Sequence, residues 1–156
     1  MIRECEPNDI NKILDCVNLA QSVADVPQMN EVNTQFLIQN LKKGIVSPDH
    51  KILVKETQNK IIAFIVGSIS QNIHNDKVYG EVTYLFVHPE MMKWTVSAEL
   101  FKELENWFIE ENCEYLVALP SSWNSDYTIN NNLLEEMKNF YDKQCNLVGY
   151  VFVKGL

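Results

Sequence analysis

Residues 79–119 give the clearest indication of the fold. They read YGEVTYLFV at 79–87, TVSAELFKELENWFIEEN at 95–112 and YLVAL at 115–119. The first and last runs are short and largely apolar, which is typical of buried strands. Between them, apolar side chains recur at helical spacing, at Val96, Leu100, Phe101, Leu104, Trp107 and Phe108. A helix that joins two strands of one sheet is a crossover connection, so the two strands are predicted to be parallel.

The segments around this unit complete the predicted order of elements. Residues 51–55 and 61–70 predict a hairpin closed by the polar turn TQNK at 57–60, and residues 2–6 predict a first strand. Helices are predicted after Pro7 and after Asn33 or Thr34, the second ending at Lys43-Gly44. A helix around 133–141 and a strand at 147–154 finish the chain. The order β-α-α-β-β-β-α-β-α-β predicts one α/β domain over residues 1–156, with a mixed sheet (α+β) and helices on both faces.

Strand geometry also predicts which side chains of residues 79–87 share a face. Successive side chains of a strand alternate. One face is expected to carry Glu81, Thr83, Leu85 and Val87, and the other Val82, Tyr84 and Phe86.

Charge and composition exclude several functions. The net charge is −8, from 21 acidic and 13 basic side chains, and Arg3 is the only arginine. Nucleic-acid binding and binding to an anionic membrane surface both need clustered basic residues, so neither is expected. The longest apolar run, residues 61–66, is too short to span a bilayer.

The cysteines and the first residues predict a location. Cysteines stand at positions 5, 16, 113 and 145, with no C-x-x-C pair and no histidine at ligand spacing, so we expect reduced thiols and no metal. Residues 2–7 are charged where a secretory signal requires an apolar core. The sequence therefore predicts a cytoplasmic protein.

Three motifs make the chain similar to the GNAT superfamily of N-acetyltransferases. They are EVTYLFVHPE at 81–90 before the long helix, NFYDK at 139–143 before GYVFVK at 149–154, and the opening Ile2-Arg3-Glu4 with Asp9 behind it. The resemblance covers essentially the whole chain and implies that family's fold. Residues 144–156 leave room for one strand of its closing hairpin, and an exposed last strand would suit a homodimer.

The resemblance implies acetyl-CoA as acyl donor, an amine as acceptor and a set of positions that hold the donor. The backbone of the strand would bind the pantetheine arm, and the following loop and helix start would bind the diphosphate. These positions are Leu85, Phe86, Val87, Met92, Lys93, Trp94, Thr95, Val96, Ser97 and Ala98. The family's phosphate loop reads R/Q-x-x-G-x-G/A, and every signature position differs here. An ordinary capped helix without a ligand is therefore an alternative interpretation.

The resemblance also implies roles for four side chains. Glu81 matches a catalytic glutamate and would accept the proton of the amine, which is protonated at neutral pH. Tyr141 would protonate the departing thiolate, while Trp123 and Tyr127 would line the acceptor pocket. The alternatives are a surface glutamate at Glu81 and a core aromatic at Tyr141.

Three hypotheses about function follow. The first is an acetyl-CoA-dependent N-acetyltransferase that acts on a small amine or a protein amino group. The second is a binding or assembly protein of the same fold that has lost coenzyme A binding, which the missing glycines would favour. The third is an enzyme of this fold that uses a different acyl thioester.

Overall fold

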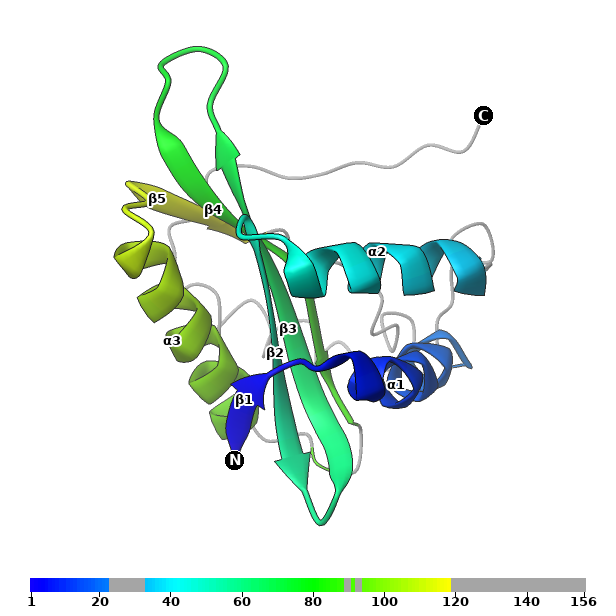
Figure 1. Ribbon diagram of the computed structural model, residues 1–156. Coiled ribbons are helices and arrows are strands. Elements are labelled where there is room, and N and C mark those ends of the chain that lie inside the picture. The colour runs from blue at the N-terminus through cyan, green and yellow to red at the C-terminus, as the bar shows by residue number, and fades with distance from the viewer. Residues whose placement is uncertain (23–32, 89–90, 92–93, 119–156) are drawn as a thin grey trace.

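Five strands form one mixed sheet in the computed structural model, which describes residues 1–22, 33–88, 91 and 94–118 (Figure 1). They lie side by side in chain order as β1 (Ile2–Glu4), β2 (His50–Thr57), β3 (Lys60–Gln71), β4 (Val78–Val87) and β5 (Tyr115–Ala118). Helices α1 (Ile10–Ser22) and α2 (Thr34–Val46) precede β2, and α3 (Trp94–Glu110) stands between β4 and β5.

The pairing of the strands confirms the predicted hairpin and crossover. Strands β1 to β4 pair antiparallel with their neighbours, whereas β4 and β5 are parallel. The predicted last helix, near 133–141, and last strand, 147–154, lie outside the described residues.

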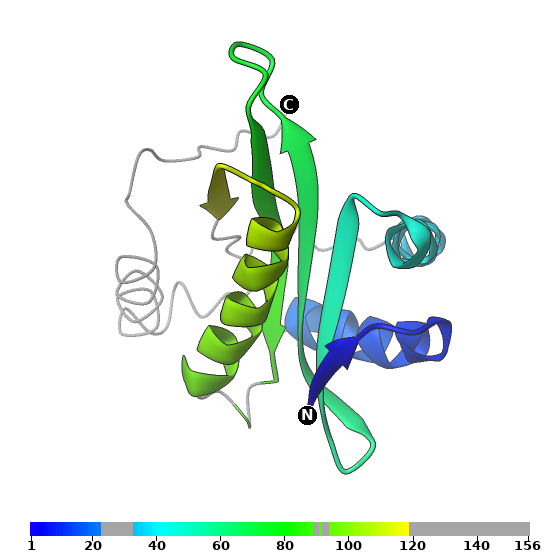
Figure 2. The ribbon, with the colours of Figure 1, turned by 60° about the vertical axis from the view of Figure 1, so that its left-hand side comes forward.

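Helices cover both faces of the sheet, as Figure 2 shows, and each face has its own apolar core. On one face, α1 and α2 pack on the sheet through a cluster that includes Ile13, Leu41, Phe64 and Phe86. On the other face, α3 packs through Leu100, Leu104 and Phe108 against Ile65 and Val82. The periodicity of residues 95–112 correctly predicted this face of α3, because its apolar stripe is the part that is buried.

Helix α2 begins as predicted but ends later. The side chain of Asn33 caps its first turn, accepting a hydrogen bond of 3.0 Å from the N–H of Phe36. The predicted end at Lys43-Gly44 is wrong, because the helix continues to Val46. Gly44 is buried inside it, where a Cβ would lie 3.2 Å from Ile52 Cδ1. This glycine allows the helix to approach β2 closely rather than ending it.

A β-bulge interrupts β4. The register pairs Val66 of β3 with Tyr84 and the next residue, Gly67, with Val82, so Thr83 is an extra residue. The predicted alternation along β4 is wrong for this reason, since one extra residue exchanges the two faces of a strand. Val82 lies with Leu85 on the α3 face, and Glu81 lies on the opposite face with Tyr84 and Phe86.

Gly80 provides the closest approach of α3 to the sheet and gives a first prediction. A Cβ at this position would lie 2.5–2.6 Å from three ring atoms of Phe108, which is itself buried. We expect Gly80→Ala to lower the free energy of unfolding by about 1–3 kcal/mol, measured by urea denaturation, because the ring has no space to move into.

Gly44→Ala is the matched control. It brings the new Cβ to 3.2 Å from Ile52 Cδ1, the flexible end of a side chain, and it favours the helix, so its loss of stability should be clearly smaller than that of Gly80→Ala. Equal stability of Gly80→Ala and the wild type would contradict the packing of α3 described above.

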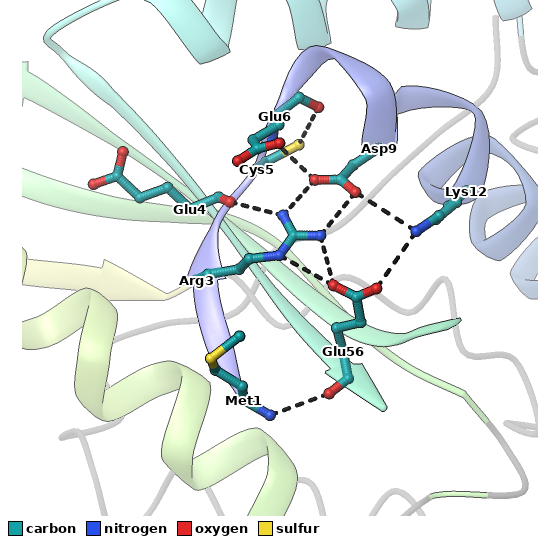
Figure 3. Close-up of polar contacts among 8 residues, drawn as sticks. All are labelled: Met1, Arg3, Glu4, Cys5, Glu6, Asp9, Lys12 and Glu56. Carbon is teal, nitrogen blue, oxygen red and sulfur yellow. Dashed lines mark hydrogen bonds and ion pairs between the residues drawn. The ribbon is translucent and has the colours of Figure 1, made fainter. Parts of the chain in front are cut away.

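A partly buried polar cluster, centred on the buried Asp9, fixes the start of α1 against the sheet (Figure 3). The guanidinium of Arg3, on β1, contacts both oxygens of Asp9, at 2.6 and 3.0 Å, and donates to Glu56 of β2 at 2.7 Å. Asp9 also accepts from the N–H of Glu6 at 2.9 Å, which caps the 3-10 turn η1 (Pro7–Asp9) ahead of α1. Hydrogen bonds from Arg3 lower the pKa of both carboxyl groups.

Candidate functional site

The edge of β4 that faces β5 is only partly paired. The parallel register runs from Tyr79 opposite Tyr115 to Val82 opposite Ala118, where β5 ends. Strand β4 continues for five residues beyond Val82. Within the described part of the chain, no strand pairs with these five residues on that side.

Backbone groups of Leu85 and Val87 point toward this open side. The N–H of His88 donates to the carbonyl of Ile62 in β3 at 2.8 Å, and the register places Phe86 opposite Phe64. In an antiparallel pair, residues that bond to the neighbouring strand alternate with residues that direct both backbone groups away from it. Phe86 therefore bonds to β3, and Leu85 and Val87 offer an N–H and a C=O each on the β5 side.

Helix α3 begins at the same end of the sheet as the open edge, and six residues separate it from β4 (Figure 2). Its first N–H groups have no acceptor within the helix, and they carry the positive end of the helix dipole. The first turn contains no carboxylate. The nearest one along the helix, Glu99, is paired with Lys55 of β2 at 2.5 Å. The start of α3 is therefore suited to an anion.

The side chains of the first turn of α3 differ in exposure. Val96 and Ser97 are buried, Ala98 is half-buried and Thr95 is exposed. Val96 packs in the α3 core, so it can offer a ligand only its backbone. Met92 and Lys93 lie outside the described residues, and only the backbone of Trp94 is described.

Glu81 precedes the bulge residue Thr83 in β4. It is half-buried on the face covered by α1 and α2, opposite Ser68 of β3 and Val117 of β5. Among the described residues, none forms a hydrogen bond or an ion pair with its carboxylate. Glu81 and the open edge thus occupy two sides of one bulge, with the carboxylate on the α1–α2 face and the backbone groups of Leu85 and Val87 at the strand edge.

The neighbouring phenol, Tyr84, has a structural role. It stacks on Phe64 with ring centroids 5.2 Å apart, and burial raises its pKa to about 12. It therefore stays neutral near pH 7 and packs the face on which Glu81 lies.

A family model identifies the chain. The model of the acetyltransferase (GNAT) family matches residues 18–145, which is most of the chain and includes β4 and α3. The chain belongs to the GNAT acetyltransferase family. The predicted resemblance is confirmed, and acetyl transfer is the chemistry of this family.

Solved structures share the GNAT fold over the full length of the chain. A ribosomal-protein-alanine N-acetyltransferase from Brucella melitensis biovar Abortus superposes with a TM-score of 0.69 at 10% identity, covering 100% of this chain and 99% of the other. An aminoglycoside acetyltransferase from an uncultured soil metagenomic sample gives 0.71 at 14%, covering 100% and 95%. A transcriptional regulator from Bacillus halodurans gives 0.75 at 9%, covering 100% and 98%. No curated protein matches the sequence.

The GNAT structure brings together only some of the predicted site residues. Glu81, Leu85, Phe86 and Val87 lie on β4, and residues 94–98 form the first turn of α3. The predicted acid Tyr141 and the predicted pocket residues Trp123 and Tyr127 lie outside the described residues. Sequence reasoning missed Thr83, because a bulge in a run of strand-forming residues leaves no sequence signal.

The described residues offer neither a metal-ion site nor a membrane-spanning helix. They contain no group of three histidine, cysteine, aspartate or glutamate side chains placed to hold a metal ion. No described helix is long and apolar enough to cross a membrane.

Proposed function

We propose that this GNAT protein is an acetyl-CoA-dependent N-acetyltransferase that modifies a primary amine of a small molecule or a protein. The observation that carries the proposal is the open edge of β4. It offers the backbone groups of Leu85 and Val87 beside the start of α3, and Glu81 lies in the same strand on the other side of the bulge residue Thr83.

The residues present fit an acyl-coenzyme A ligand. An extended pantetheine arm needs backbone donors and acceptors, which Leu85 and Val87 have to offer. A diphosphate needs free N–H groups without nearby negative charge, and the carboxylate-free first turn of α3 meets that need. The family's two glycine positions fall on Thr95, which is exposed, and Ser97, which is buried; both side chains are small, and their hydroxyl groups would be additional donors to a phosphate oxygen.

Each residue of the proposed site has a distinct task. Bound acetyl-CoA supplies an acyl group that is activated as a thioester. The N–H of Leu85 or Val87 would stabilise negative charge on an oxygen held at the edge. Glu81 would accept the proton of the amine, directly or through water, and Tyr141 would donate a proton to the sulfur of the leaving thiolate. Transfer would be direct, without a covalent bond to the enzyme.

The acceptor is proposed at the level of an amine. The excess of acidic side chains, 21 against 13 basic ones, favours the approach of a cation such as an ammonium group. Structures of this fold include an aminoglycoside acetyltransferase and a ribosomal-protein-alanine N-acetyltransferase, so the fold serves small-molecule and protein acceptors. Trp123 and Tyr127 remain the predicted lining of the acceptor pocket.

Thermal unfolding with acetyl-CoA tests the proposal. A ligand that binds only the folded state adds about 2.7 kcal/mol of stability at 100 times its Kd, which raises the Tm by several degrees. We expect such a shift with acetyl-CoA, and none with an equal concentration of acetate. An unchanged Tm at millimolar acetyl-CoA would favour the alternative of a GNAT-fold binding protein, for which the comparisons give no support.

The described cysteines support a reducing, cytoplasmic location. Burial raises the pKa of Cys5 to about 12 and that of Cys16 to about 11, so both remain unreactive thiols at neutral pH. The three described cysteines are free. A homodimer remains a prediction.

A further inference from the structure

Thr83 is the bulge residue of β4, because no residue of β3 stands opposite it in the register. Val66 and Gly67 are consecutive in β3, yet their partners in β4 are Tyr84 and Val82. The extra residue is exposed, so burial does not explain its position.

Its hydroxyl bridges the interruption in the ladder. Thr83 Oγ1 donates to the carbonyl of Val66 at 3.2 Å, at the last regular pair before the register shifts. A threonine is restricted in χ1 by its branched Cβ, so this single bond also limits how the backbone of the bulge can turn. The side chain therefore ties the bulge residue of β4 directly to the neighbouring strand β3.

The bulge determines both parts of the proposed site. A continuous ladder with one residue fewer would exchange the faces and edges on one side of the interruption. Either Glu81 would move to the α3 face, or Leu85 and Val87 would direct their backbone groups into β3. The carboxylate and the open edge can serve one reaction only while the bulge is maintained.

We propose that Thr83 is a positioning residue, whose bond to the Val66 carbonyl holds the bulge so that Leu85 and Val87 present their backbone groups to the acyl donor. This inference rests on the proposed function. The role that it assigns to Thr83 acts through the backbone of β4.

Two substitutions separate the hydroxyl from the shape of the side chain. Thr83→Val keeps the branched Cβ and loses the bond, whereas Thr83→Ser keeps the hydroxyl. Thr57→Val is the matched control, since Thr57 is also an exposed strand threonine and lies at the far end of β2. Acetyl-CoA affinity is measured by calorimetry, and hydrogen exchange of the Tyr84 amide is measured by NMR in the ligand-free proteins.

We expect Thr83→Val to raise the Kd for acetyl-CoA roughly two- to tenfold, the range that one net hydrogen bond represents, and to speed exchange at Tyr84. Thr83→Ser should recover most of the affinity, and Thr57→Val should match the wild type. Unchanged affinity in Thr83→Val would overturn the inference, even if exchange at Tyr84 became faster. A wild-type protein that binds no acetyl-CoA would instead overturn the proposed function, and this inference with it.

Discussion

Glu81→Gln is expected to lower kcat about 100- to 10,000-fold, the usual contribution of a positioned general base. Glutamine has nearly the same shape as glutamate but cannot accept the proton of an ammonium group. The half-buried carboxylate has no hydrogen-bond or ion-pair partner among the described residues, so the substitution should leave folding intact. Acetyl-CoA binding should also be unchanged, because Glu81 lies on the opposite side of the bulge from the open edge.

The measurement is the initial rate of thiol release from acetyl-CoA with a panel of primary amines. Glu103→Gln is the matched control, because Glu103 is an exposed carboxylate in the middle of α3. A rate for Glu81→Gln within twofold of the wild type would show that another group, or water alone, accepts the proton. Loss of acetyl-CoA binding together with the rate would show that Glu81 has a structural task instead.

Arg3→Met is expected to lower the free energy of unfolding by about 3–5 kcal/mol, because it removes the partner of a buried charge. The side chain of Asp9 is only 4% exposed, and Arg3 is its bidentate partner. Lys12 approaches Asp9 no closer than 4.0 Å, so it replaces the guanidinium poorly. Urea unfolding measures the loss.

Lys77→Met is the control for this substitution. Lys77 and Glu114 form an ion pair of 2.6 Å, but their side chains are 47% and 50% exposed. Exposed ion pairs are screened by water and contribute little to stability, so its loss should be small. Similar losses of unfolding free energy in Arg3→Met and Lys77→Met would contradict the view that burial of Asp9 makes the Arg3–Asp9 pair important.

The same cluster determines part of the response to acid. The pKa values of Asp9 and Glu56 are lowered in the folded protein, so their stabilising effect is present above their unfolded pKa values of about 4. It is lost as the pH falls through the lowered folded values. Stability of the wild type should therefore decline below about pH 4, and Arg3→Met should show a smaller decline over that interval.

Much of the fold could be predicted because the buried apolar residues recur in the sequence at the spacing of a helix or a strand. The stripe from Val96 to Phe108 predicted α3 and its buried face, and the apolar runs predicted β3 and β4. The end of α2 could not be predicted from Gly44, since glycine serves a close approach as well as a helix end. The packing against Ile52 that decides between these uses comes from a distant part of the chain.

The candidate site could be predicted only in outline. The residues of β4 and the start of α3 were identified, but their relative faces were not, because Thr83 shifts the register by one residue. Threonine is common in regular strands, so nothing in EVTYLFV distinguishes a bulge from a continuous ladder. Only the pairing of β4 with β3 reveals it.

The proposed coenzyme A site can be mapped by titrating the isotope-labelled protein with coenzyme A and following its backbone amides by NMR. We expect the largest shifts at Leu85, Val87 and residues 95–98, which lie at the open edge of β4 and the first turn of α3. Saturating coenzyme A that leaves these amides unchanged, or that shifts only residues elsewhere, would contradict the proposed site.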